Sequence, residues 1–176
     1  MNTVKTQLPQ ISLIAEDLGF LTQEVLDLRD ESGFPTTDMT LFTEREDALA
    51  LVDFLKAHPA VDSGKIFLFG GSMGGLVNVM ASQARPEDVA GLGLLFPALC
   101  IPENWTERYA TDEEIPQSIE FWGLTLGKGF VTSLRGMDVF AKMPEYSKPV
   151  IIFQGAKDPI ARLADKIAGI FVPIVM

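Results

Sequence analysis

The sequence contains 176 residues, a length that favours a single compact domain. Its net charge of −10, from 24 acidic and 14 basic residues, would repel the phosphate backbone of a nucleic acid. Hydrophobic residues make up 47% of the chain, but the longest apolar stretch, residues 89–102, is shorter than the about 20 residues that a membrane span needs.

Apolar runs alternate with amphipathic segments, a pattern typical of an α/β protein with a mostly parallel sheet and helices on both faces. The first predicted elements are, in order, a helix over 11–18, a strand over 24–28, a loop over 29–40 and a helix that ends before Pro59. Thr43 and Glu46 match a T-x-x-E capping box, which predicts the start of this second helix. Four side chains share its apolar face: Ala48, Leu51, Val52 and Leu55.

The remainder of the chain contains three further predicted strands, the first of which leads into a glycine-rich turn. The expected elements are a strand over 65–69, a helix over 76–83, strands over 91–96 and 149–154, a helix over 159–168 and an apolar run over 170–176. Residues 101–146 interrupt this alternation and are less regular. We therefore expect one domain over residues 1–176 with an insertion at 101–146.

Residues 70–74 read Gly-Gly-Ser-Met-Gly and fit the G-x-S-x-G pattern of a nucleophile elbow. The pattern lies between a predicted buried strand and a predicted helix, which is the context that the elbow requires. In such a turn a side chain two positions before or after Ser72 would collide with the neighbouring strand and helix, and Gly75 adds clearance. An idle serine in a strand-to-helix turn and a phosphate-binding loop are the alternatives, although no G-K-[ST] is present.

Two further groups complete the predicted site. The turn directs the backbone N–H of Met73 toward an oxyanion at the helix start. Asp158 follows the strand over 149–154, where a carboxylate at the edge of the sheet orients an imidazole and stabilises its charged form. The order Ser72 then Asp158 matches the α/β-hydrolase order. The alternative for Asp158 is a turn before the next helix.

The chain has a single histidine, His58, and its position excludes it as the base. It precedes the strand over 65–69 whereas Ser72 follows it, and five strand residues span about 16 Å. A base must come within about 3 Å of the hydroxyl that it deprotonates. We therefore expect His58 to end a helix and to interact with exposed carbonyl groups there.

The sequence resembles α/β-hydrolases of the cinnamoyl and feruloyl esterase-like and serine aminopeptidase-like group. The matching stretches lie along nearly the whole chain: residues 25–29, 32–33, 38–40, 46–48, 69–75 and 148–155, with Asp158. The resemblance implies a serine hydrolase that acts on a small-molecule carboxylic ester without a metal or other cofactor. It also implies that residues 101–146 form a lid-like insertion.

The sequence departs from this group in four places. Gly71 stands where relatives usually have a histidine, and residues 29–33 read Arg-Asp-Glu-Ser-Gly where relatives often have G-H-G-x-S. In addition, no H-G oxyanion segment precedes Ile11, and no histidine follows Asp158 before Met176. The resemblance therefore implies an incomplete α/β-hydrolase fold, truncated at both ends, with weak or no activity. A non-catalytic binding protein and a degenerate remnant on the same scaffold are the alternatives. Loss of the leading strands would also expose a sheet edge that can pair with a second copy.

Aromatic side chains gather in the insertion: Trp105, Tyr109, Trp122 and Tyr146. They either line an apolar or aryl acyl pocket or pack the insertion onto the sheet. The lone Cys100 lies in an apolar run and is expected to be packed rather than reactive. Because no apolar signal segment opens the sequence and no internal disulfide is possible, we expect a cytoplasmic protein without membrane or nucleic-acid partners.

Overall fold

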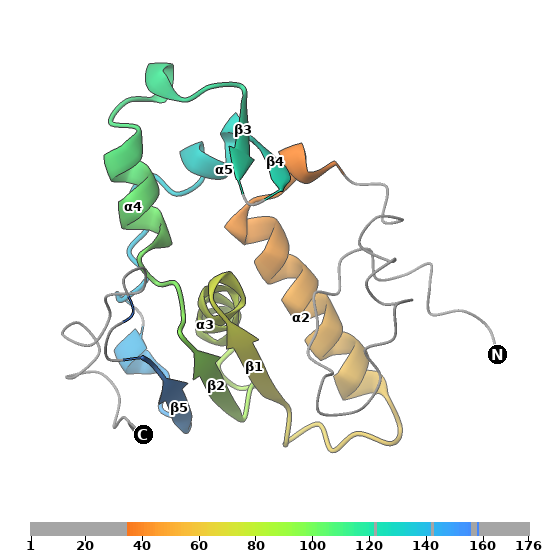
Figure 1. Cartoon of the computed structure of the whole chain (residues 1–176). Helices are drawn as coiled ribbons and strands as arrows, with labels where there is room; N and C mark the ends of the chain where they lie inside the picture. The colour runs from red at the N-terminus through yellow and green to blue at the C-terminus, as the bar shows by residue number, and fades with distance from the viewer. Residues whose placement is uncertain (1–34, 122, 142, 156–157, 159–176) are drawn as a thin grey trace.

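Among the residues that the structure describes, a three-stranded parallel sheet lies at the centre (Figure 1). The computed structural model describes residues 35–121, 123–141, 143–155 and residue 158. The strands are β1 (Phe67–Gly71), β2 (Gly91–Leu95) and β5 (Val150–Phe153), in the order β1-β2-β5. The α/β prediction with a parallel sheet is therefore confirmed. The predicted elements over 11–18, 24–28, 159–168 and 170–176 lie outside the described residues.

Helix α3 (Met73–Ala84) covers one face of the sheet and packs against β1 and β2. Leu68, Leu94 and Ile152 point toward it from the three strands and are buried. Strand β1 ends at Gly71, two residues later than predicted, and α3 begins three residues earlier than predicted. The turn between them is therefore reduced to one residue, Ser72.

Helix α2 (Leu41–Ala57) packs beside α3. It begins two residues before Thr43, so the predicted start at a Thr43–Glu46 box is wrong. Thr40 caps the helix instead: its side chain accepts a hydrogen bond from the Thr43 N–H at 3.1 Å, and Thr43 Oγ1 accepts one from the Thr40 N–H at 2.9 Å. The earlier start brings Leu41, which is completely buried, into the first turn. The helix ends before Pro59, as predicted.

Most of residues 101–146 form a group of short elements at the top of Figure 1. The group comprises α4 (Ile101–Arg108), the 3₁₀ turn η4 (Asp112–Glu114), strands β3 (Ser118–Phe121) and β4 (Leu124–Gly127), and α5 (Lys128–Thr132). The 3₁₀ turn η5 (Met143–Glu145) lies apart from it and contacts α3. Strands β3 and β4 form an antiparallel hairpin. The 3₁₀ turn η3 (Thr36–Asp38) joins this group, because Thr36 Oγ1 donates a hydrogen bond to Thr125 O at 2.7 Å.

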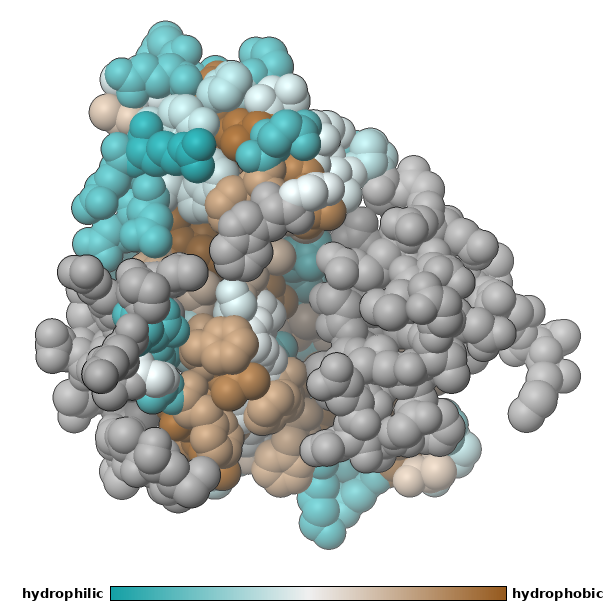
Figure 2. Space-filling model, in the orientation of Figure 1, coloured by the Kyte–Doolittle hydropathy of each residue, from teal (hydrophilic) through white to brown (hydrophobic). Residues whose placement is uncertain are grey.

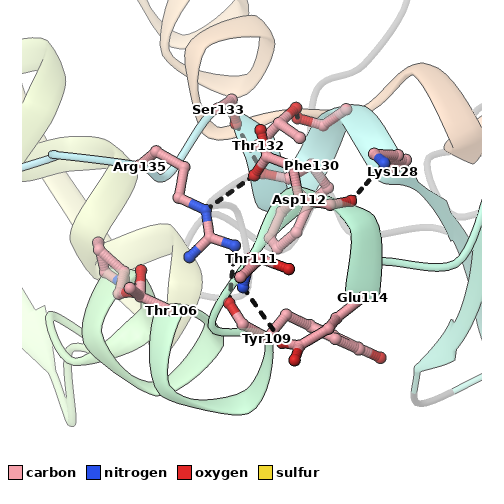
Figure 3. A network of polar contacts seen from close by, with 12 residues as sticks. Thr106, Tyr109, Thr111, Asp112, Glu114, Lys128, Phe130, Thr132, Ser133 and Arg135 are labelled. Carbon is pink, nitrogen blue, oxygen red and sulfur yellow. Dashed lines mark hydrogen bonds and ion pairs between the residues drawn. The ribbon is translucent and has the colours of Figure 1, made fainter.

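Arg135 holds the insertion together at the end of α4 (Figure 3). Its Nη2 donates to the carbonyl oxygen of Tyr109, the C-cap of α4, at 2.7 Å, and its Nε donates to Asp112 Oδ1 at 3.1 Å. Lys128 of α5 donates to the carbonyl oxygen of Asp112. One guanidinium therefore connects the end of α4 to η4, and η4 connects to α5.

Candidate active site

Ser72 is the single residue between β1 and α3, and its backbone is strained. Its φ is 51° and its ψ is −123°, in a region that residues other than glycine rarely adopt. Its N–H donates to Leu95 O at 3.0 Å, and its carbonyl oxygen accepts from the N–H groups of Ala98 at 2.9 Å and Gly75 at 3.1 Å. These bonds hold an abrupt change of chain direction at the carboxyl end of β1.

The glycines around Ser72 contribute unequally to this turn. A Cβ on Gly70 would lie 2.6 Å from Gly74 O, and a Cβ on Gly75 would lie 2.8 Å from Pro97 Cβ. A Cβ on Gly74 would meet nothing within 4 Å, so the predicted collision at this position is wrong. Gly74 is exposed at the start of α3, whereas Gly75 is buried against the segment that follows β2.

Met73 is the first residue of α3, at the helix end where backbone N–H groups lack internal acceptors. The partial positive charge of the helix dipole is concentrated there. Met73 is half-buried, in contact with the core on one side. Its N–H therefore belongs to a local environment that favours a negative charge beside Ser72.

Asp158 lies beyond the carboxyl end of β5, on the same edge of the sheet as Ser72. The register pairs Gly71 with Leu95 and Leu95 with Phe153, so the three strands end level. With β2 between them, the ends of β1 and β5 are separated by two strand spacings, about 10 Å. The structure thus brings the two predicted catalytic residues to one rim of the sheet.

Gln154 holds the Asp158 carboxylate. Gln154 Nε2 donates to Asp158 Oδ2 at 3.0 Å, and the Asp158 N–H donates to Gly155 O at 3.1 Å. Gln154 is not among the residues that the sequence predicts for the site, although its place directly after β5 is the available signal. This hydrogen bond to one carboxylate oxygen fixes the orientation of the group.

His58 lies at the other end of β1 from Ser72, as the sequence predicted (Figure 1). It is the C-cap of α2 and is exposed. Its Nδ1 accepts a hydrogen bond from the Ala60 N–H at 3.2 Å, and its ring lies 5.9 Å from that of Phe54. The predicted interaction with carbonyl groups is therefore replaced by one with a backbone N–H, and His58 has no part in the candidate site.

Trp105, Tyr109 and Tyr146 of the insertion pack against neighbouring groups and do not line either of the two open grooves beside residues 136–139. Trp105 is buried and meets the rings of Tyr109, Phe121 and Phe130 at 5.1–6.2 Å. Tyr146 is buried as well: its hydroxyl donates to Val89 O at 3.1 Å, and burial raises its pKa to about 12. Trp122 lies outside the described residues.

Two open grooves, of about 330 and about 370 Å³, lie on either side of residues 136–139. Neither Ser72 nor Asp158 lines them. Cys100 is half-buried, accepts a hydrogen bond from Asn104 Nδ2 at 3.5 Å, and burial raises the pKa of its thiol, in line with a packed cysteine.

Residues 35–121, 123–141, 143–155 and 158 contain no group of histidine, cysteine and acidic side chains that could hold a metal ion. Within the same ranges, no helix combines the length and the apolar character that crossing a bilayer requires.

Several solved structures are similar to this chain. Est1E from Butyrivibrio proteoclasticus with bound ferulic acid superposes with a TM-score of 0.70 at 26% identity, over 80% of this chain and 60% of that one. The mouse alpha/beta hydrolase domain-containing protein 10 gives 0.59 at 21% identity, over 79% and 60% of the two chains. A structure from the metagenome-derived lipolytic enzymes LipS and LipT gives 0.58 at 18% identity, over 80% and 62%.

These likenesses define the class: the chain has the α/β-hydrolase fold, and it is similar in structure to esterases and lipases of that fold. It spans about 60% of the length of these solved structures. No family model matches the sequence. A stretch of 32 residues, 18% of the chain, is 56% identical to 4-alpha-glucanotransferase of Streptococcus pneumoniae but covers only 6% of that protein.

Proposed function

We propose that this chain carries the nucleophile and the acid of a serine hydrolase that acts on carboxylic esters. The observation that carries the proposal is the strained backbone of Ser72, held at the rim where β5 also delivers Asp158. Strain of this kind at a residue other than glycine persists where the surrounding structure imposes it, and it is concentrated at functional sites. The similarity to Est1E and to lipolytic enzymes supports this assignment.

In the proposed reaction, Ser72 Oγ bonds to the acyl carbon, its proton passes to a base, and the alcohol leaves with a proton from the same base. The Met73 N–H donates to the oxygen that becomes negative. Asp158 orients the imidazole and stabilises its charged form. Residues 101–146, which follow β2 at this end of the sheet, act as a lid-like insertion within a single domain over residues 1–176.

The base is the part that this chain does not provide. Its one histidine, His58, lies at the opposite end of β1. Loss of the base from such a triad lowers the rate by several powers of ten. We therefore expect the 176 residues alone to hydrolyse an ester at a rate near background, and we expect this rate to increase when a base is added.

Hydrolysis of p-nitrophenyl acetate with and without added imidazole tests the proposal. Because imidazole also hydrolyses this ester in solution, the informative quantity is the rate that depends on Ser72. We expect imidazole to produce an increment that Ser72→Ala abolishes and that Ser147→Ala, at an exposed serine in the loop before β5, retains. Equal rates for the chain and Ser72→Ala at all imidazole concentrations would contradict the proposal.

A second candidate function is non-catalytic ligand binding. The observation that favours it is the position of His58, at the opposite end of β1 from Ser72. A scaffold without a base at the rim can retain a ligand site after losing catalysis. Two results together would support this function over the first. The chain would bind an ester saturably with an affinity that Ser72→Ala leaves unchanged, and imidazole would add no Ser72-dependent rate of hydrolysis.

A further inference from the structure

Strand β5 delivers a polar side chain to the rim of the sheet. The strands themselves carry exposed apolar side chains, including Phe67, Phe69 and Ile151, and Figure 2 shows this hydrophobic surface in brown in the lower centre of the view. Gln154 is the first polar residue after the apolar strand Val150–Phe153, and it is half-buried. Polar groups that are withdrawn from water are normally hydrogen-bonded, so the partner of this amide indicates its role.

The partner of this amide is the candidate catalytic acid. Gln154 Nε2 donates a hydrogen bond to Asp158 Oδ2 at 3.0 Å. The backbone just before Gln154 is anchored to the sheet, since the carbonyl oxygen of Phe153 accepts a hydrogen bond from the Phe96 N–H at 2.7 Å. The donor is therefore held by the strand, whereas the acceptor lies beyond the end of that strand.

Asp158 is restrained at its backbone and at its side chain by different bonds. Its N–H donates to Gly155 O at 3.1 Å, and this bond restrains the backbone of the residue but does not set the rotation of its side chain. The bond from Gln154 ends on the carboxylate itself, so it restrains the direction in which the two carboxylate oxygens face. The geometry of the acid at the rim therefore depends on Gln154.

We propose that Gln154 is a positioning residue for the reaction: it orients the Asp158 carboxylate toward the base and affects Ser72 only through that acid. The inference rests on the proposed function, in which Asp158 orients an imidazole. The base of such a triad must be held in one orientation to take the proton of the nucleophile, and a displacement of about 1 Å can lower a rate by about a hundredfold. The amide donor is neutral, so the negative charge of Asp158 remains available to stabilise the imidazolium.

A second glutamine of the same fold makes a comparable bond without reaching the rim. Gln83 is half-buried near the end of α3 that lies away from Ser72, and its Nε2 donates to Val139 O at 2.9 Å. The bond from Gln154 ends on a carboxylate, whereas the bond from Gln83 ends on a backbone carbonyl oxygen. Gln83→Leu is therefore a matched control, because it removes a bond of similar length and leaves Asp158 untouched.

Hydrolysis of p-nitrophenyl acetate by the full chain tests this proposal, measured as the rate increment that depends on both imidazole and Ser72. Gln154→Leu and Gln154→Glu both remove the N–H donor, and each should lower the apparent kcat of this increment by about tenfold. The KM for the ester should stay unchanged, because Gln154 acts on the acid and not on the ester. Gln83→Leu should leave both constants nearly unchanged. Circular dichroism confirms that each variant is folded.

The same substitution in an Asp158→Ala background separates positioning from a general structural role. There Gln154→Leu should lower the increment no further, because residues that act as one unit are not additive.

Two results would overturn this inference and leave the proposed function intact. A fall in kcat after Gln154→Leu that is no larger than after Gln83→Leu would mean that the bond to Asp158 only supports the segment after β5. An equal fall with and without the Asp158 carboxylate would mean that Gln154 does not act through the acid. A wild-type chain that shows no Ser72-dependent increment would overturn the proposed function, and this inference with it.

Discussion

The backbone N–H of Ala98 donates a hydrogen bond to the carbonyl oxygen of Ser72 at 2.9 Å. This bond ties the strained residue after β1 to the segment that leaves β2. Together with the bond from the Ser72 N–H to Leu95 O, it fixes Ser72 on both sides. The geometry of the candidate nucleophile therefore depends on the residues at and after the end of β2 as much as on the glycines of its own turn.

The strain at Ser72 predicts that glycine is preferred there for stability. Ser72→Gly should be more stable than Ser72→Ala by about 1 kcal/mol, because glycine adopts a φ of 51° without steric cost. Chemical denaturation of both variants measures the difference. At Ser147, in the loop before β5, the same pair of substitutions should show no preference for glycine. A Ser72→Ala variant as stable as Ser72→Gly would mean that the turn is not strained.

The two glycines at the start of α3 should respond in opposite ways to alanine. Gly75→Ala should destabilise the fold by about 2 kcal/mol, since its Cβ would press on Pro97, and a forced overpacking costs about 1–3 kcal/mol. Gly74→Ala meets no atom within 4 Å and should stabilise α3 by up to about 1 kcal/mol through helix propensity. Thermal denaturation checks both, and the reverse ranking would contradict the packing described for the elbow.

Several parts of this site follow from local sequence, and others do not. The elbow at Ser72 is predictable because its glycine spacing and flanking apolar runs lie within a dozen residues. Asp158 is predictable because it lies four residues after the end of the apolar strand predicted over 149–154. The Gln154 bond to Asp158 and the Ala98 bond to Ser72 depend on side-chain orientation and on strand register, which the linear pattern does not contain.

The start of α2 and the roles of the glycines also depend on tertiary contacts, which the linear sequence does not contain. The capping box is at Thr40 rather than Thr43 because Leu41 is buried, and burial is a tertiary property. The tight contact at Gly75 is made with Pro97, which lies twenty-two residues further along the chain, whereas a Cβ on Gly74 would meet nothing within 4 Å. Sequence periodicity identifies the elements, but it does not identify which glycine is under steric pressure.

The buried hydroxyl of Tyr146 predicts an alkaline loss of stability. Its folded pKa is raised to about 12 by burial, above the about 10 of an unfolded tyrosine. The neutral phenol therefore stabilises the fold fully below pH about 10, and this contribution falls as the pH rises toward about 12. Tyr146→Phe loses the bond to Val89 O, about 1 kcal/mol at neutral pH, but should lack this alkaline decline.

Urea denaturation between pH 7 and pH 11 measures the free energy of unfolding of the chain and of Tyr146→Phe. The difference between these two free energies should become smaller as the pH rises above about 10. Tyr109→Phe, at a half-buried tyrosine that stacks on Trp105, is the control for loss of a phenol. A difference that stays constant across the range would show that ionisation of Tyr146 is not opposed by the fold.

Arg135 should control the order of the insertion. Arg135→Met removes the bonds to Tyr109 O and Asp112 Oδ1, and we expect a loss of about 1–2 kcal/mol. Amide hydrogen exchange should accelerate first at the end of α4 and in η4, before β1 and β2 respond. Arg45→Met, which removes an ion pair with the adjacent Glu46 on α2, is the matched control. Uniform acceleration across the sheet would contradict a local role.

Covalent acylation of Ser72 is the most direct test of the central claim that this residue is a nucleophile at the sheet rim. The chain is exposed briefly to p-nitrophenyl acetate with imidazole, the imidazole is removed by gel filtration, and the acetyl group is located by mass spectrometry of peptides. Because deacylation needs the same base, we predict that the acetyl group remains on Ser72 and is absent from that peptide in Ser72→Ala. Acetylation confined to lysines, identical in the chain and in Ser72→Ala, would contradict the account.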